Sequence, residues 1–205
     1  MPTTTSWGST ATYLTGTYEE DLQPWIESIV AKKPSMVVDI GAADGYYAVG
    51  LARRLPGAVV YAFDIDPTAQ RVLRRTVRLN GVKNVRVRGR LDTRALQDLL
   101  VHGAFVFSDC EGFEIELLDP IKVPMLRTAT LIVELHDMID PRCSSTINRW
   151  FRESHLVTII DEAPKTARGR AQLDHLSPAE AEAAVDEERP ADVAPNQWAI
   201  MTPRV

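Results

Sequence analysis

The sequence predicts an α/β protein built on a doubly wound, mostly parallel β-sheet. From about Ser35 onward, short apolar runs rich in Val, Ile and Phe alternate with longer amphipathic stretches. The short runs are apolar almost throughout, as strands are when helices cover both faces of a parallel sheet. Turn residues or charged residues bound each run, and the longer stretches have the length of the helices that connect parallel strands. Together these observations indicate the fold class.

Seven runs are expected to form strands, and the stretches around them are expected to form helices. The expected strands are residues 36–40, 58–64, 85–88, 104–109, 130–135, 156–161 and 196–203. The expected helices are residues 20–32, 46–55, 67–80, 93–101, 113–118, 141–153 and 178–188. The helix over 67–80 has the clearest ends, because Pro67 occupies its first turn and Asn80-Gly81 stops it.

Length and composition fit one globular domain. The chain has 205 residues, of which 45% are apolar and 25% charged, a mix typical of folded soluble proteins. The net charge of −5 argues against nucleic acid as the main partner. We see no signal peptide and no apolar run of bilayer length, and Cys110 and Cys143 fit reduced thiols, so a cytoplasmic protein without a membrane partner is expected. Residues 1–34 are expected to form an N-terminal helical cap on a core of residues 35–205, which contains an insertion at about 162–195.

A glycine-containing turn follows the first expected strand. In "VVDIGAADGYYAVGLA", Gly41 and Gly45 stand where the strand passes into a helix, which is where doubly wound sheets bind nucleotides. The spacing lacks the third glycine of the dinucleotide fingerprint, which disfavours an NAD-linked oxidoreductase. Asp39 and Asp44 would repel a pyrophosphate and favour a ligand with an ammonium or sulfonium group. Asp64, 23 residues after Gly41, ends the second strand where it could bind both hydroxyls of a ribose. These features suggest S-adenosylmethionine (SAM).

The same stretch, followed by "VVYAFDIDPTAQ", resembles motifs I and II of the class I SAM-dependent methyltransferases. The resemblance extends over roughly residues 36–160 and implies a seven-stranded, Rossmann-like methyltransferase fold with SAM as cofactor. It also implies an antiparallel last strand, which "NQWAIMTP" after "HLVTIID" would allow. The SAM-binding residues that it implies are Asp39, Gly41, Ala42 and Gly45 for the methionine half, Asp64 for the ribose, and Ile65, Arg90 and Leu91 for the adenine.

The stretch "LTGTYEEDLQPWI", residues 14–26, resembles a segment that folds over the cofactor in some small methyltransferases. On this interpretation Tyr18 and Glu19 contact SAM or the substrate. The structural alternative is a helix start with Thr17 as N-cap and Glu20 as its capping-box partner.

Acidic residues follow the fourth and fifth expected strands. "FVFSDCEGFEIELL" resembles the D-x-E-G-x-E segment of the FkbM-type methyltransferases, and "LIVELHD" resembles the strand-five ending of that family. The resemblance places Asp109, Glu111, Glu134 and His136 beside the transferred methyl group, because active sites of open α/β sheets lie at the carboxyl ends of strands.

Two chemistries fit these residues. In the favoured one, His136 or a carboxylate acts as general base and takes a proton from the acceptor. In the other, Asp109, Glu134 and His136 hold a divalent metal ion such as Mg²⁺, which acidifies an acceptor hydroxyl. A purely structural alternative is that Glu134 and His136 pair with each other or with arginines.

Nine of the 23 Lys and Arg residues fall between residues 71 and 94. RNA binding is one interpretation. We favour an edge strand whose positive charge prevents pairing between sheets, because no aromatic residues are interleaved to stack bases. In and after the insertion, the residues that could recognise substrate are Arg168, Arg170, His175, Arg189 and Trp198.

The predicted function is therefore transfer of a methyl group from SAM to a hydroxyl of a small molecule, of natural-product or sugar type. Asp109, Glu111 and Glu134 would frame this acceptor, and His136 would act as the base. Methylation of an amine stays open, as does an RNA-binding or RNA-methylating protein of the same fold. A homodimer is compatible with the sequence.

Overall fold

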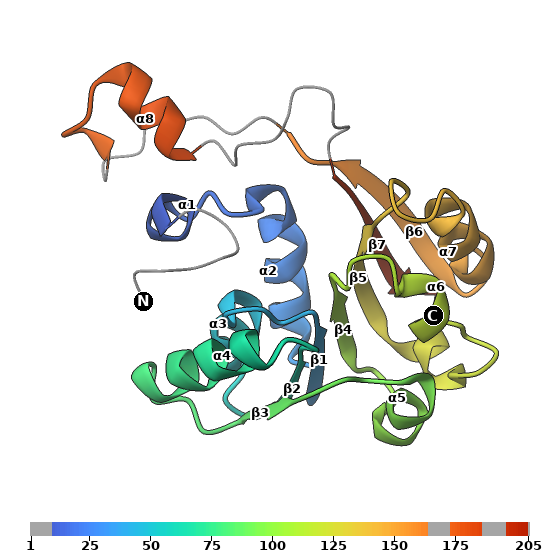
Figure 1. Ribbon diagram of the computed structural model, residues 1–205. Helices are drawn as coiled ribbons and strands as arrows, with labels where there is room; N and C mark the ends of the chain where they lie inside the picture. The colour runs from blue at the N-terminus through green and yellow to red at the C-terminus, as the bar shows by residue number, and fades with distance from the viewer. Residues whose placement is uncertain (1–9, 164–172, 186–195, 205) are drawn as a thin grey trace.

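The computed structural model describes residues 10–163, 173–185 and 196–204. Seven strands form one sheet in the order β3-β2-β1-β4-β5-β7-β6 (Figure 1). The strands from β1 to β5 pair in parallel, whereas β7 runs antiparallel to both β5 and β6. The predicted fold class and the antiparallel last strand are thus confirmed. The strands are β1 Met36–Ile40, β2 Val59–Phe63, β3 Val85–Arg88, β4 Phe105–Ser108, β5 Thr130–Leu135, β6 His155–Asp161 and β7 Gln197–Pro203.

The expected helices are present, most with ends that differ by a few residues, while the expected end of the last one, at 188, lies outside the described residues. They are α2 Gln23–Lys32, α3 Tyr46–Arg54, α4 Pro67–Leu79, α5 Thr93–Leu99, α6 Glu114–Leu117, α7 Cys143–Phe151 and α8 Pro178–Val185. Three short elements complete the described chain: the α-helix α1 Thr10–Thr15 and the 3₁₀ helices η1 Glu20–Leu22 and η2 Pro124–Thr128. The sequence analysis did not foresee α1 or η2. Within the described ranges, no helix is long and apolar enough to cross a bilayer.

The structural alternative for residues 14–26, a helix start with Thr17 as N-cap, is wrong. The residue before η1 is Glu19, whose backbone is left-handed with φ 46° and whose side chain makes no capping hydrogen bond. The Thr17 hydroxyl instead lies 2.9 Å from the hydroxyl of Thr15, where both side chains are buried. A side-chain N-cap is found instead at α4. There the Asp66 carboxylate accepts a hydrogen bond of 2.8 Å from the Thr68 N–H.

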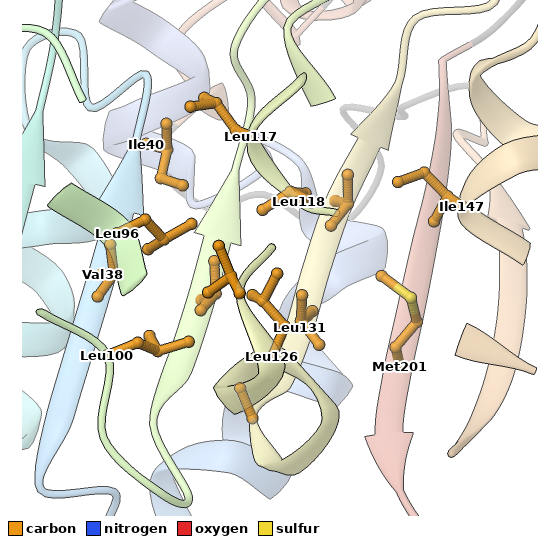
Figure 2. Close-up of a cluster of buried hydrophobic side chains, with 14 of the residues drawn as sticks. Val38, Ile40, Leu96, Leu100, Leu117, Leu118, Leu126, Leu131, Ile147 and Met201 are labelled. Atoms are coloured by element: carbon orange, nitrogen blue, oxygen red, sulfur yellow. The ribbon is translucent and has the colours of Figure 1, made fainter. Parts of the chain in front are cut away.

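Helices cover both faces of the sheet, as the near-continuous apolar strands require. On one face α2, α3 and α4 pack over β1 and β2, and on the other α5, α6 and α7 pack over β4 to β6 (Figure 1). Figure 2 shows the second layer, in which side chains of β1, β5 and β7 meet those of the helices and η2. The labelled side chains there are Val38, Ile40, Leu96, Leu100, Leu117, Leu118, Leu126, Leu131, Ile147 and Met201.

The described part of the expected insertion lies against the N-terminal cap, where α8 contacts α1 (Figure 1). A capping box starts α8, since the Ser177 hydroxyl lies 2.6 Å from the Glu180 carboxylate and the Ser177 N–H donates to it at 3.0 Å. His175 is exposed just before this helix. The candidates Arg168, Arg170 and Arg189 lie outside the described residues.

Two glycines allow the turn after β1 to pack tightly. Gly41 has φ +83°, and a Cβ there would lie 1.6 Å from the Asp109 carbonyl oxygen. Gly45, with φ +95°, begins α3, and a Cβ there would lie 2.3 Å from a methyl carbon of Leu73 in α4. The turn after β1 therefore touches the end of β4 directly.

We expect Gly41→Ala to lower the free energy of unfolding by about 3 kcal/mol or more, because the added methyl group meets backbone that cannot move aside. Gly50→Ala is the matched control, since a Cβ at this position in α3 has no heavy atom within 4 Å. The control should raise the free energy of unfolding by about 0.5–1 kcal/mol, as alanine does in a helix. Urea denaturation followed by circular dichroism measures both, and equal effects would contradict the packing argument.

Candidate functional site

The glycine-containing turn is held at the carboxyl end of β2. The Gly41 and Ala42 N–H groups both donate to the Phe63 carbonyl oxygen at 2.9 Å. The Asp64 carboxylate accepts from the Ala43 N–H at 2.9 Å, although Ala43 has a left-handed backbone with φ 44°. Asp64 is half-buried, so it organises the turn and still presents a carboxylate at the surface.

Asp39 brings a buried negative charge to the same place. It is 1% exposed, and its Oδ2 atom has no hydrogen-bond partner among the described residues. Burial, followed by the charge of Asp109, raises the pKa of Asp39 to about 8. An ammonium group of a ligand would satisfy this oxygen and restore the ionised form.

Beside Asp64 the surface is partly apolar. The side chains of Ile65 and Phe113 are both exposed, Ile65 to 73%. The Arg90 guanidinium lies 6.0 Å from the centre of the Phe113 ring. These side chains are accessible to a flat ring such as adenine. Leu91, in contrast, packs into the core layer of Figure 2. The sequence analysis did not single out Phe113.

A row of aromatic rings joins the N-terminal cap to the sheet. Tyr13 of α1 stacks on Tyr46 at 4.9 Å, and Tyr18 meets Tyr46 edge-on at the same centroid distance. Tyr47 continues the row to Phe107 of β4 at 4.0 Å. Burial raises the pKa of all four tyrosines, so their hydroxyls stay protonated. The segment with Tyr18 thus lies over the turn between β1 and α3.

Glu19 takes part in this row and reaches the acids of the sheet. Its carboxylate accepts hydrogen bonds from the Tyr18 and Tyr47 hydroxyls. Its charge is also among those that raise the pKa of Glu134 at the end of β5. Tyr18 and Glu19 therefore lie close to the start of α3 and near enough to the strand-end acids for their charges to interact.

His136 lies at the centre of the predicted acidic residues. Its Nδ1 is 2.7 Å from Glu114 Oε1, while its Nε2 lies 3.6 Å from oxygens of Asp109, Glu111 and Glu134. Burial disfavours the imidazolium, but the hydrogen bond and charge of Glu114 and the other carboxylates outweigh it and raise the pKa of His136. The structure thus brings together all four residues predicted to surround the acceptor.

Asp109 and Glu134 form a carboxyl pair. A hydrogen bond joins their side chains. Burial and then the Asp109 charge raise the pKa of Glu134, and burial raises that of Asp109, so the pair keeps a proton at neutral pH. Asp109 and Glu134 therefore share one proton between them.

No role was predicted for Glu114 from the sequence, although the quoted D-x-E-G-x-E segment contains it. Glu114 is the first residue of α6 and is 0% exposed. The only sequence signal was its place in that segment, because a glutamate at the start of a short helix is ordinarily solvated.

Backbone strain also gathers around the site. Four described residues other than glycine have positive φ, and three of them, Glu19, Ala43 and Glu111, belong to this region. A left-handed backbone is costly for such residues and is found mostly where function requires it.

Asp109, Glu111 and His136 also offer one ligand atom each within 4.8 Å of one another. The sequence analysis had instead grouped Asp109 and His136 with Glu134 as metal ligands. Trp198, expected to recognise substrate, is 2% exposed and packs on Phe107 at 5.4 Å, so its side chain belongs to the core.

We expect Glu134→Gln to stabilise the protein more at pH 8 than at pH 5.5. A carboxyl whose pKa is raised on folding costs stability as pH rises above its ordinary value of about 4.3. Glutamine can keep the hydrogen bond to Asp109 but does not titrate, so the gain at pH 8 should be about 1–3 kcal/mol. Urea denaturation at the two pH values measures it, with the exposed Glu153→Gln as control. A gain that does not depend on pH would contradict the shared proton.

Comparison with known proteins adds to this geometry. The family model of the TRM5/TYW2 methyltransferase domain matches residues 24–111, which is less than half of the chain. A search of curated proteins finds no match. The FkbM-type resemblance is not confirmed by these comparisons.

Solved structures share the fold at low identity. A precorrin-6y C5,15-methyltransferase from Geobacter metallireducens has a TM-score of 0.57 at 11% identity, over 86% of this chain and 87% of its own. An O-methyltransferase from Bacillus cereus, in complex with SAH, has a TM-score of 0.56 at 16% identity, over 91% and 80%. An rRNA methylase from Streptococcus thermophilus has a TM-score of 0.54 at 14% identity, over 86% and 93%. The strand order and the family match agree, and both indicate the fold of class I SAM-dependent methyltransferases.

Proposed function

We propose that the protein transfers a methyl group from SAM to a hydroxyl group of a small molecule, with His136 as the general base. The observation that carries the proposal is the convergence of His136 with Asp109, Glu111 and Glu134 at the ends of β4 and β5. This cluster lies directly beside the glycine-containing turn, because Gly41 packs against the Asp109 backbone.

The residues around the turn fit SAM. The unpartnered Oδ2 of Asp39 suits the ammonium group of the methionine part, and the backbone turn of Gly41 and Ala42 follows directly after this strand end. Asp64 is placed for the ribose hydroxyls, and the exposed Ile65 and Arg90 for the adenine. Tyr18 would close the site from the N-terminal cap. When bound, SAM supplies a methyl group that its sulfonium activates for transfer.

His136 would take the acceptor's proton as the new bond to the methyl group forms. Asp109 and Glu111 would hold the acceptor in line, since carboxyl oxygens accept hydrogen bonds from hydroxyls, while Glu134 shares a proton with Asp109. Most of the rate enhancement would come from this positioning. An amine acceptor would contact the same three side chains, so N-methylation stays an alternative for this site.

The acceptor site favours a small molecule over RNA. Within the described ranges, none of the carboxylates around His136 forms an ion pair with Lys or Arg. Such an uncompensated negative site repels phosphates. Natural-product or sugar hydroxyls carry no such charge.

RNA methylation is nevertheless the second candidate, for two reasons. The matched family model is that of TRM5/TYW2, and the basic stretch is exposed on α4 and on the edge strand β3. The exposed arginines are Arg71, Arg74, Arg75, Arg78, Arg86 and Arg88. RNA as the acceptor predicts steeply salt-dependent RNA binding, with filter binding at 50 mM and 200 mM salt as the measurement.

The cofactor assignment predicts that Asp64→Ala weakens binding of S-adenosylhomocysteine (SAH) at least ~100-fold in calorimetric titration, because both the ribose partner and the hold on the Ala43 N–H are lost. The exposed Asp98→Asn should bind like the unchanged protein. Unchanged affinity in Asp64→Ala would remove Asp64 from the cofactor site. Repeating the titration in EDTA and with added Mg²⁺ tests the metal alternative.

His136→Asn should lower turnover with a hydroxyl acceptor by about 10²–10⁴-fold, the usual contribution of a general base. The acceptor is first found by following SAH release across a panel of phenols, sugars and amino sugars. In the unchanged protein, activity should rise with pH through the raised pKa of His136, because only the neutral imidazole accepts a proton. The exposed His102→Gln should retain full activity. Full activity of His136→Asn would exclude His136 as the base.

A further inference from the structure

We infer that Glu114 is the positioning residue of this reaction: it holds the Nδ1–H of His136 and so leaves Nε2 to accept the proton. The inference rests on the proposed function, in which His136 is the base. It assigns a role to a residue that the cofactor site and the acceptor site do not themselves use.

The contact is short and enclosed. Glu114 Oε1 lies 2.7 Å from His136 Nδ1, and the side chains of Glu114 and His136 are 1% and 6% exposed. Three further donors hold the carboxylate: the Gly112 N–H at 3.2 Å and the thiols of Cys110 at 3.6 Å and Cys143 at 3.8 Å. These donors come from the turn after β4 and from α7, so the carboxylate is fixed from two sides.

This arrangement determines the tautomer of the imidazole. An ionised carboxylate can only accept hydrogen bonds, so the Nδ1 atom at 2.7 Å must carry a hydrogen. In neutral His136 the lone pair is then on Nε2, whose contacts with Asp109, Glu111 and Glu134 are all 3.6 Å. These distances are too long for hydrogen bonds, so Nε2 is available to an acceptor hydroxyl that enters between them.

The negative charge of Glu114 has a second effect. A buried carboxylate is costly without a partner, and among the described residues no Lys or Arg pairs with Glu114. The imidazolium that forms on proton transfer supplies the missing positive charge. A neutral amide at this position would fix the ring equally well but would not stabilise that product, so the charge can be tested apart from the shape.

The test is Glu114→Gln, compared with Glu116→Gln on the exposed side of the same helix. Glutamine keeps the size and one acceptor oxygen but removes the charge. We expect kcat to fall at least ~10-fold while the acceptor KM and the affinity for SAH change less than about 2-fold. Glu116→Gln should leave kcat and KM unchanged.

The pH–rate profile gives a readout that a purely structural role would not move. Glu114 is one of four carboxylates that face His136, with Asp109, Glu111 and Glu134, and all favour the imidazolium. Removing the Glu114 charge should therefore shift the rising limb of the profile to lower pH. A lower kcat with an unshifted limb would mean that Glu114 only supports packing, and an unchanged kcat would overturn the inference.

A second measurement needs no Glu114 variant. Nitrogen-15 NMR of the unchanged protein should show His136, assigned by its loss in His136→Asn, as the Nδ1–H tautomer above its pKa. An Nε2–H tautomer would overturn the inference even if Glu114→Gln failed to fold. Full activity of His136→Asn would instead contradict the proposed role of His136 as the base. Titration with SAH would then show separately whether the protein binds the cofactor.

Discussion

The site depends on one backbone contact, between the turn after β1 and the end of β4. Gly41 lies so close to the Asp109 carbonyl that no side chain fits between them. Because β4 pairs in parallel with both β1 and β5, this contact also sets how far the turn lies from Glu134 and His136. A single approach of two backbones therefore fixes the distance between the glycine-containing turn and the acids at the ends of β4 and β5.

Several carboxyl groups are buried around that contact. Asp39 and Glu134 are almost fully buried, and burial and the nearby charge of Asp109 keep each of them largely protonated. Glu114 is the exception, because burial is outweighed by the hydrogen bond and charge of His136, which lower its pKa. Similar carboxyl groups thus take different protonation states according to their neighbours. This separation of states is what acid–base chemistry at neutral pH requires.

Much of this could be read from the sequence. The apolar runs over β1 and β5 became strands with the predicted ends, since a buried parallel strand needs nothing beyond apolar residues and a turn. The edge strand β3 was also predicted with its observed ends, from its alternation of Val and Arg. The acids at the ends of β4 and β5 were found because parallel strands end at one edge of the sheet. Both inferences depend on local pattern and on a general rule of topology.

What the sequence did not reveal depends on contacts between distant residues. The segment of α1, "TATYLT", has no apolar helical pattern, and Tyr13 stacks on Tyr46 of α3 instead. In the sequence Glu114 looks like a surface residue, because its partner His136 lies 22 positions further along the chain. Trp198 looked accessible next to a polar stretch, but β7 inserts between β5 and β6 and buries it. In each case a tertiary contact overrides the local signal.

The left-handed residues Glu19, Ala43 and Glu111 have a consequence for how this protein would respond to selection. Each adopts a backbone that glycine would accept more readily, and each lies beside carboxyl groups that are kept close against their mutual repulsion. Substitutions in this region are therefore the ones expected to raise the free energy of unfolding most. In a library selected for heat resistance alone, substitutions would be expected to accumulate first in this proposed site, while the sheet and its helices stayed unchanged.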